Sequence, residues 1–207
     1  MKTYSLLIGA ISLILLSGCS KNDDVSPITV MDYANLHVGN YWVYEWYEID
    51  PLGNTTIFNK RDSIYIKKDT LIAGREYFIR TGTFLESERT TILFDSANSI
   101  YLYPSREVLF TYDFDLKYTQ TYGPEDNSIA IASYSLSRDY FVIEVPAGPF
   151  ACINYEGVIE PLDPDYEYGD RVNSNYYARD VGLVSMRTQF YSSPNDLEMR
   201  LVKYGTN

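Results

Sequence analysis

The sequence predicts an all-β protein, built as a single antiparallel, strongly curved sheet or β-barrel-like domain of about a dozen strands, with a β-sandwich as the alternative. From Tyr41 onward apolar and polar residues alternate with a period of two, which is typical of half-buried strands. The 207 residues include 21 Tyr, 9 Phe and 2 Trp, and aromatic side chains favour strands. Turn residues separate the alternating segments without a longer linker. We therefore expect one β domain over residues 31–207.

The N-terminus has the pattern of a secretory signal peptide over residues 1–18. Lys2 supplies a positive charge, and a largely apolar run follows over residues 6–16 before the chain turns polar at Ser17. A membrane-spanning helix needs about 20 apolar residues, so this run is too short to be one. The pattern favours a cleaved leader over a transmembrane anchor.

Residues 16–19, Leu-Ser-Gly-Cys, resemble a bacterial lipobox. The resemblance implies cleavage before Cys19 and lipidation of Cys19, the one modification site that we predict. The alternative is an ordinary signal peptide that happens to contain a cysteine. Three acyl chains would make the anchoring effectively permanent. Cys152 is the only other cysteine, so lipidation of Cys19 leaves no disulfide partner for it.

Residues 19–30 are expected to form the lipidated cysteine and a flexible tether, because they are polar and lack apolar periodicity. A short helical or irregular turn is expected over residues 31–36. The first strand is predicted over residues 41–49, and its alternation places Trp42, Tyr44 and Trp46 on one face. We expect that face to point into the core.

A turn over residues 50–54 follows, since Pro presets φ and Gly accepts positive φ. The same alternation between turn residues predicts the remaining strands at residues 55–66, 75–83, 91–94, 100–103, 108–112, 129–136, 140–145, 151–159, 175–179, 183–191 and 197–204. Residues 146–149, Pro-Ala-Gly-Pro, predict a tight corner that leads Phe150 into the core. Gly182 predicts a bulge or a bend.

Four segments in order resemble motifs of uncharacterised lipid-anchored β-proteins from the Bacteroidetes phylum. They are residues 36–44 with Val-Gly-Asn-Tyr-Trp-Val-Tyr, 109–116 with Tyr-Asp-Phe, 145–150 with Val-Pro-Ala-Gly-Pro-Phe, and 176–184 with Tyr-Tyr-Ala-Arg-Asp-Val-Gly-Leu-Val. The resemblance spans nearly the whole expected domain. It implies an all-β extracytoplasmic lipoprotein, and the family carries no settled activity that could be transferred.

The residues give no catalytic or cofactor signature. His37 is the only histidine, and neither a nucleophile elbow nor a dinucleotide or phosphate loop occurs. We therefore predict no catalytic residue, no cofactor and no metal ligand, and we expect Cys152 to be a small buried apolar residue. The acidic segment over residues 163–170 could present oxygens to Ca²⁺, but it lacks the ligand spacing of an EF-hand. A solvated loop is the preferred interpretation.

The net charge of −11 argues against a nucleic-acid partner. Three functions are compatible with the sequence. The first is a non-catalytic protein of the outer membrane that binds a small molecule, a glycan or a protein partner. The second is a structural or assembly subunit of the envelope, and the third is a carboxylate-dependent hydrolase. A hollow, aromatic-lined interior would favour ligand binding, and a filled interior would favour surface interactions.

The residues after the cysteine bear on the location. Ser20 lacks the charge of the Asp that commonly retains lipoproteins in an inner membrane, which favours the outer membrane. The segment over residues 20–24, Ser-Lys-Asn-Asp-Asp, resembles the acidic tags that direct Bacteroidetes lipoproteins to the cell surface. Display on the cell surface is therefore favoured over the periplasmic face.

Overall fold

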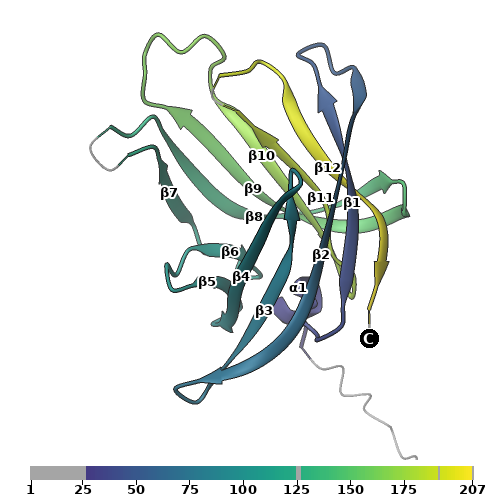
Figure 1. The fold of residues 1–207 in the computed structure, drawn as a ribbon. Coiled ribbons are helices and arrows are strands. Elements are labelled where there is room, and N and C mark those ends of the chain that lie inside the picture. Colours follow the sequence, from purple (N-terminus) through teal and green to yellow (C-terminus); the bar gives the residue numbers. More distant parts are fainter. Residues whose placement is uncertain (1–26, 125–126, 191, 207) are drawn as a thin grey trace, which may run out of the picture.

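A computed structural model describes residues 27–124, 127–190 and 192–206 (Figure 1). They contain one short helix, α1 (Val30–Ala34), and twelve strands. The strands are β1 (Tyr41–Ile49), β2 (Thr55–Ile72), β3 (Arg75–Phe84), β4 (Ser87–Ser96), β5 (Ser99–Tyr103), β6 (Val108–Thr111), β7 (Tyr118–Tyr122), β8 (Ala130–Val145), β9 (Gly148–Pro161), β10 (Arg171–Ala178), β11 (Gly182–Gln189) and β12 (Asp196–Gly205). Within these ranges no helix is both long and apolar enough to span a membrane.

All twelve strands belong to one antiparallel sheet in the order β6-β5-β4-β3-β2-β1-β12-β11-β10-β9-β8-β7. Neighbours in the sheet are neighbours in sequence, except that β1 pairs with β12. The sheet curls into a nearly closed barrel (Figure 1). The predicted barrel-like sheet is confirmed, and the alternative of a two-sheet sandwich is wrong.

Register irregularities explain why the sheet curls. They occur in six strand pairs, including β1 with β12 between Val43 and Tyr44, and β8 with β9 between Leu136 and Tyr140. A bulge bends its strand and increases the local twist. Because such irregularities recur in six strand pairs around the sheet, they favour a curved sheet over a flat one.

The edge strand β6 contacts the opposite part of the sheet through aromatic side chains. The Phe110 ring of β6 stacks on the Tyr177 ring of β10, with 4.0 Å between the ring centroids. It also meets the Tyr155 ring of β9 edge-on at 6.0 Å. Strands from opposite parts of the sheet order thus meet inside the barrel.

Helix α1 lies at the lower end of the sheet in Figure 1 and links its two sides. The Tyr33 ring stacks on Tyr112 with a centroid distance of 5.1 Å, and the Asp180 amide donates to the Asp32 carbonyl at 2.7 Å. Val30 and Tyr33 are buried in the core. The short helix therefore bridges the chain after β6 and the turn between β10 and β11.

The first strand buries the face that the alternation predicted: Trp42, Tyr44 and Trp46 are at most 4% exposed. Trp42 Nε1 donates to the Val181 carbonyl at 2.6 Å, and the Tyr44 hydroxyl donates to the Leu183 carbonyl at 2.8 Å. β12 lies between β1 and β11 in the sheet, so both bonds cross the interior. Hydrogen bonds therefore connect the first of the four sequence motifs, residues 36–44, with the last, residues 176–184.

The Asp62 carboxylate is a buried polar group that fastens the hairpin between β3 and β4. It accepts hydrogen bonds from Trp46 Nε1 at 2.6 Å and from the amides of Leu85 and Glu86 at 2.7 and 3.0 Å. Leu85 and Glu86 form the turn at φ of 50° and 67°. Burial raises the pKa of Asp62, but its hydrogen bonds, including one from the Thr83 side chain, outweigh burial and hold it below its usual value.

The structure differs from the sequence prediction at several strands. β7 was not predicted, because Tyr-Thr-Gln-Thr-Tyr carries little apolar signal. The strands expected at 129–136 and 140–145 form one continuous strand, β8, whose register shifts where the break was expected. β2 continues to Ile72, beyond the expected end at residue 66. Most of the added residues are exposed and give no burial pattern.

Gly182 is needed for a close approach and lies at a bend, one of the two features expected there, because it ends the turn between β10 and β11. The register of β10 and β11 shifts between Tyr176 and Tyr177, whereas Gly182 opens β11 with φ of 104°. A Cβ on Gly182 would lie 3.1 Å from Trp42 Nε1. Glycine therefore allows the Trp42 indole to reach the Val181 carbonyl.

Candidate functional site

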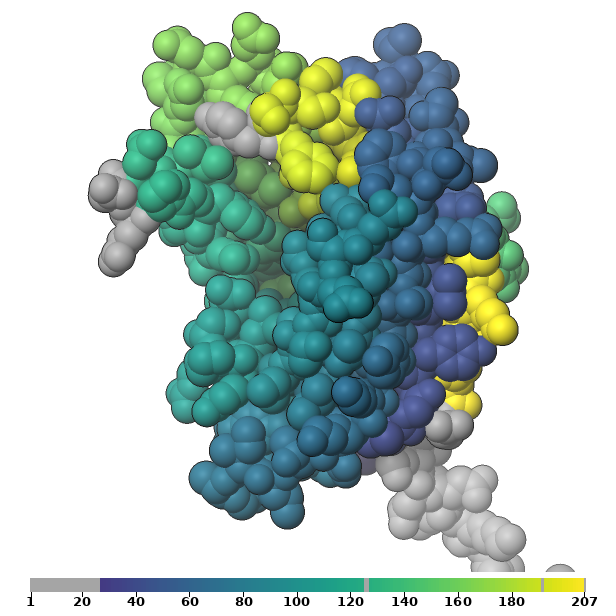
Figure 2. Space-filling model, viewed as in Figure 1, coloured from purple at the N-terminus to yellow at the C-terminus, as the bar shows by residue number. Residues whose placement is uncertain are grey.

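The barrel interior is hollow at one side and contains a cavity of about 330 Å³. Figure 2 shows the molecular surface hollowed between β4 and the region of β7 and β8. Strands from both halves of the sheet contribute to the cavity wall. Its volume lies at the lower end of the range of roughly 300–1,000 Å³ that is usual for small-molecule sites.

The wall is mainly apolar and aromatic. Its large side chains include Trp42, Tyr44, Phe110, Tyr177, Met186 and Met199. Methionine adapts its shape to irregular ligands, and aromatic rings offer large, rigid contact surfaces. Among the described residues that line the cavity there is no Asp, Glu or His. The carboxylate pair required by the hydrolase hypothesis is therefore not found in this wall.

Arg80 of β3 brings a positive charge into this apolar wall. Arg80 is half-buried: many protein atoms lie around its guanidinium, and the side chain borders the cavity beside Tyr44 and Tyr177. Its Nε donates to Thr91 Oγ1 at 3.0 Å. Within the described ranges no carboxylate forms an ion pair with Arg80. Burial disfavours the charged form of each group. It therefore lowers the pKa of the Arg80 guanidinium and raises the pKa of Tyr177 to about 12.

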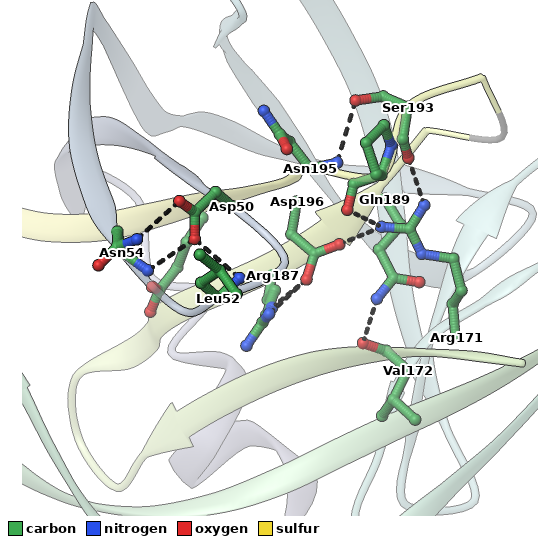
Figure 3. Close-up of polar contacts among 12 residues, drawn as sticks. Asp50, Leu52, Asn54, Arg171, Val172, Arg187, Gln189, Ser193, Asn195 and Asp196 are labelled. Carbon is green, nitrogen blue, oxygen red and sulfur yellow. Dashed lines mark hydrogen bonds and ion pairs between the residues drawn. The ribbon is translucent and has the colours of Figure 1, made fainter. Parts of the chain in front are cut away.

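Arg171 of β10 is a buried arginine whose guanidinium donors are bound by partners within the protein (Figure 3). Its side chain is 9% exposed and pairs with the equally buried Asp196 carboxylate. Its Nη1 also donates to the carbonyls of Phe190 and Ser193 at 3.2 and 2.6 Å, and its Nη2 to that of Pro194 at 3.3 Å. The Arg171 guanidinium is thus fully engaged in holding a loop, whereas that of Arg80 is not.

A second cavity, of about 220 Å³, lies beside Arg171. The Asn173 and Gln189 side chains border it, and their buried Oδ1 and Oε1 atoms have no hydrogen-bond donor among the described residues. Phe190, also in the wall, is 44% exposed. This cavity adjoins the loop that Arg171 holds.

The sequence-predicted residues lie apart from the main cavity. Cys19 and the signal peptide over residues 1–18 fall outside the described residues, as does the tether up to residue 26. Cys152 is a free thiol with no exposed surface, as expected, and burial raises its pKa to about 12. His37 is exposed in the turn before β1.

The acidic segment over residues 163–170 is exposed apart from Tyr166. The Asp163 carboxylate accepts a hydrogen bond from the Asp165 amide at 2.9 Å, which closes a local turn. Over the described ranges no group of three or more His, Cys, Asp or Glu side chains is placed to hold a metal ion. The segment contributes no residue to either cavity except Tyr166.

Sequence analysis missed Arg80, although a signal for it exists. Phe78, Arg80 and Gly82 share one face of β3, and Phe78 is buried. A charged residue in register with buried ones marks a cation that points inward.

Fold and cavity together define a small β-barrel with a ligand-sized apolar interior. No protein-family model and no curated protein matches the chain. It is similar to the crystal structure of a proposed exported protein with a YmcC-like fold from Bacteroides fragilis, with 12% identity, a TM-score of 0.49 and coverage of 84% of this chain and 99% of the other. It is also similar to a proposed lipoprotein from Parabacteroides distasonis, with 14% identity, a TM-score of 0.48 and coverage of 87% and 100%. Likenesses at this level support no inference about function, and the resemblance to Bacteroidetes lipoproteins stays a prediction.

Proposed function

We propose that this protein is a lipid-anchored, extracytoplasmic protein of the outer membrane that binds a small, largely apolar molecule inside its β-barrel. The observation that carries the proposal is the cavity of about 330 Å³ with its aromatic and methionine wall. A hollow interior of this kind favours ligand binding over the two alternatives, an envelope subunit and a carboxylate-dependent hydrolase. Binding without chemistry needs no catalytic group.

The anchor is the part of the proposal that rests on sequence alone. Lipidation at Cys19 would hold the barrel at a membrane, and the polar residues that follow would act as its tether. Mass spectrometry of the mature N-terminus tests this part, because an unmodified Cys19 would contradict it. Protease treatment of intact cells tests the side of the membrane: digestion of the barrel supports surface display, and protection supports the periplasmic face.

Binding can be tested on a chain that lacks residues 1–26. The twelve described strands and the buried core among the described residues lie within residues 27–206, so this chain keeps all the contacts described above. After removal of co-purified molecules, isothermal titration with decanol measures the affinity of the cavity for an apolar chain. Absence of heat up to the solubility limit of decanol, and of any molecule retained in native mass spectrometry, would contradict the proposal.

Two variants separate cavity binding from adsorption on the surface. Leu109→Trp places a larger side chain in the cavity wall and should weaken decanol binding at least about tenfold. Leu71→Trp makes the same change at an exposed position of β2, where the native side chain is 73% exposed, and should leave binding unchanged. Equal effects of the two substitutions would place the ligand outside the barrel.

A further inference from the structure

We infer that the ligand is an amphipathic monocarboxylate, whose carboxylate is bound by Arg80 and whose apolar part fills the aromatic cavity; this inference rests on the proposed function. It concerns only the chemical class of the ligand. Arg80 lines the cavity from β3, and its nearest wall residues include the rings of Tyr44 and Tyr177.

The free donors of Arg80 have the geometry that a carboxylate requires. The guanidinium has five N–H donors, and one of them, on Nε, is used by Thr91 Oγ1 at 3.0 Å. No further hydrogen bond of Arg80 occurs among the described residues. Both terminal nitrogens therefore remain available, and together they form the end-on fork that binds a carboxylate in a bidentate manner.

The other arginines of the described chain do not share this situation. Six of them form ion pairs: Arg61, Arg138, Arg171, Arg179, Arg187 and Arg200. Arg75, Arg89 and Arg106 are exposed, and the first two lie over aromatic rings. Only Arg80 combines an enclosed guanidinium with the absence of a carboxylate partner. An enclosed cation is costly without a counter-charge, so an anion that enters the cavity is strongly favoured.

The head group should carry one negative charge. One guanidinium balances one carboxylate, whereas a phosphate with two charges would leave one uncompensated in an apolar wall. The only other arginine that lines the cavity, Arg89, is exposed and lies over the Phe84 ring, 4.5 Å from its centroid. Water can screen it there, so it adds little to the charge balance inside.

The cavity volume sets the size of the apolar part. About 330 Å³ corresponds to roughly ten water volumes, which suits a ligand of about ten to fifteen non-hydrogen atoms. A carboxylate with a medium-length alkyl chain or with one aromatic ring fits this volume. Met186 and Met199 in the wall can adapt to either shape.

The test compares three probes of equal chain length on the chain without residues 1–26: decanoate, decanol and decylammonium. Trp42 lines the cavity, so chain-brominated forms of the probes should quench its fluorescence when they enter. Decanoate should bind about 10- to 100-fold more tightly than decanol, which is the range for hydrogen bonds to a charged group. Decylammonium should bind more weakly than decanol, because two cations would share the cavity.

Substitutions assign the preference to Arg80. Arg80→Met keeps the side-chain length and should remove the preference for decanoate over decanol. Arg80→Lys keeps the charge but not the fork and should retain a reduced preference. The matched control is Arg75→Met, which removes one positive charge outside the cavity and should change nothing.

Each outcome supports or overturns a defined claim. A decanoate preference that Arg80→Met abolishes and Arg75→Met preserves supports the inference. Equal binding of decanoate and decanol overturns the inference but leaves the proposed function intact, and absence of binding by all three probes overturns both. Should the Arg80 variants fail to fold, the order of the three probes on the unsubstituted chain decides, and decylammonium binding equal to or tighter than decanoate would overturn the inference.

Discussion

Replacement of Arg80 by Met is expected to stabilise the unliganded protein, although most substitutions at enclosed positions destabilise. The Arg80 guanidinium lies deep among protein atoms, donates one hydrogen bond of 3.0 Å to Thr91 Oγ1, and has no carboxylate partner among the described residues. Its burial therefore opposes folding unless an anion is bound. Met has a similar length and no charge to desolvate.

The size of the effect follows from two opposing contributions. Replacement of buried ion pairs by apolar groups of similar volume ranges from neutral to a gain of about 1–4 kcal/mol, and we expect the same range for Arg80, whose desolvation is not offset by a partner charge among the described residues. The lower half of that range applies here, because Arg80 borders a cavity and keeps some accessible surface. Loss of the donor to Thr91 costs about 1 kcal/mol. We expect a net increase in the free energy of unfolding of about 1 kcal/mol.

Urea unfolding of the ligand-free chain, followed by circular dichroism, measures this change. The control Arg75→Met should shift the free energy of unfolding by less than about 0.5 kcal/mol, as is usual for exposed positions. Saturation with decanoate should reverse the order, so that the unsubstituted chain becomes the more stable one. A loss of more than about 2 kcal/mol in ligand-free Arg80→Met would refute the reasoning, because it would show that Arg80 is already satisfied within the protein.

Three further variants test the fold. Asp62→Asn should lower the free energy of unfolding by about 2 kcal/mol at neutral pH, measured by urea unfolding, since it leaves buried N–H donors without an acceptor. The pKa of Asp62 is lowered on folding, so its contribution is present above the unfolded value of about 3.9 and lost as the pH falls through the folded value; the Asn variant should lack that acid-dependent loss. Gly182→Ala should cost about 2 kcal/mol in thermal unfolding, because the backbone is at φ of 104° and the new Cβ meets Trp42; an unchanged melting temperature would contradict this. Ala97→Asn with Asn98→Gly should gain about 1 kcal/mol, because both turn residues have positive φ, and a loss would show that their side chains serve another purpose.

The barrel was predictable where the alternation is strong. Trp42, Tyr44 and Trp46 alternate with half-exposed residues, so β1 and its buried face follow from the sequence. β7 was missed because a short edge strand with a polar sequence has the same local pattern as a loop. The sequence predicts a break between two strands at residues 137–139, whereas the structure has a register shift within β8, because polar residues are compatible with both.

The cavity was not predictable, because its wall is assembled from strands that are distant in sequence. Arg80 of β3 and Tyr177 of β10 are separated by six strands in the chain, and only closure of the sheet brings both side chains to the same cavity. Alternation can show that Arg80 points inward, but not that the interior there lacks a carboxylate. That absence depends on the register of all neighbouring strands.

The pairing of β1 with β12 governs when this barrel can form. β1 is among the first structured segments to be synthesised, and the strand that covers its second edge is the last, with Tyr41 paired to Gly205. The Trp42 and Tyr44 side chains likewise lack their carbonyl partners until Val181 and Leu183 have been made. The aromatic face of β1 must therefore be kept from aggregating until β12 has been made, so the barrel can close only after its twelfth strand is present.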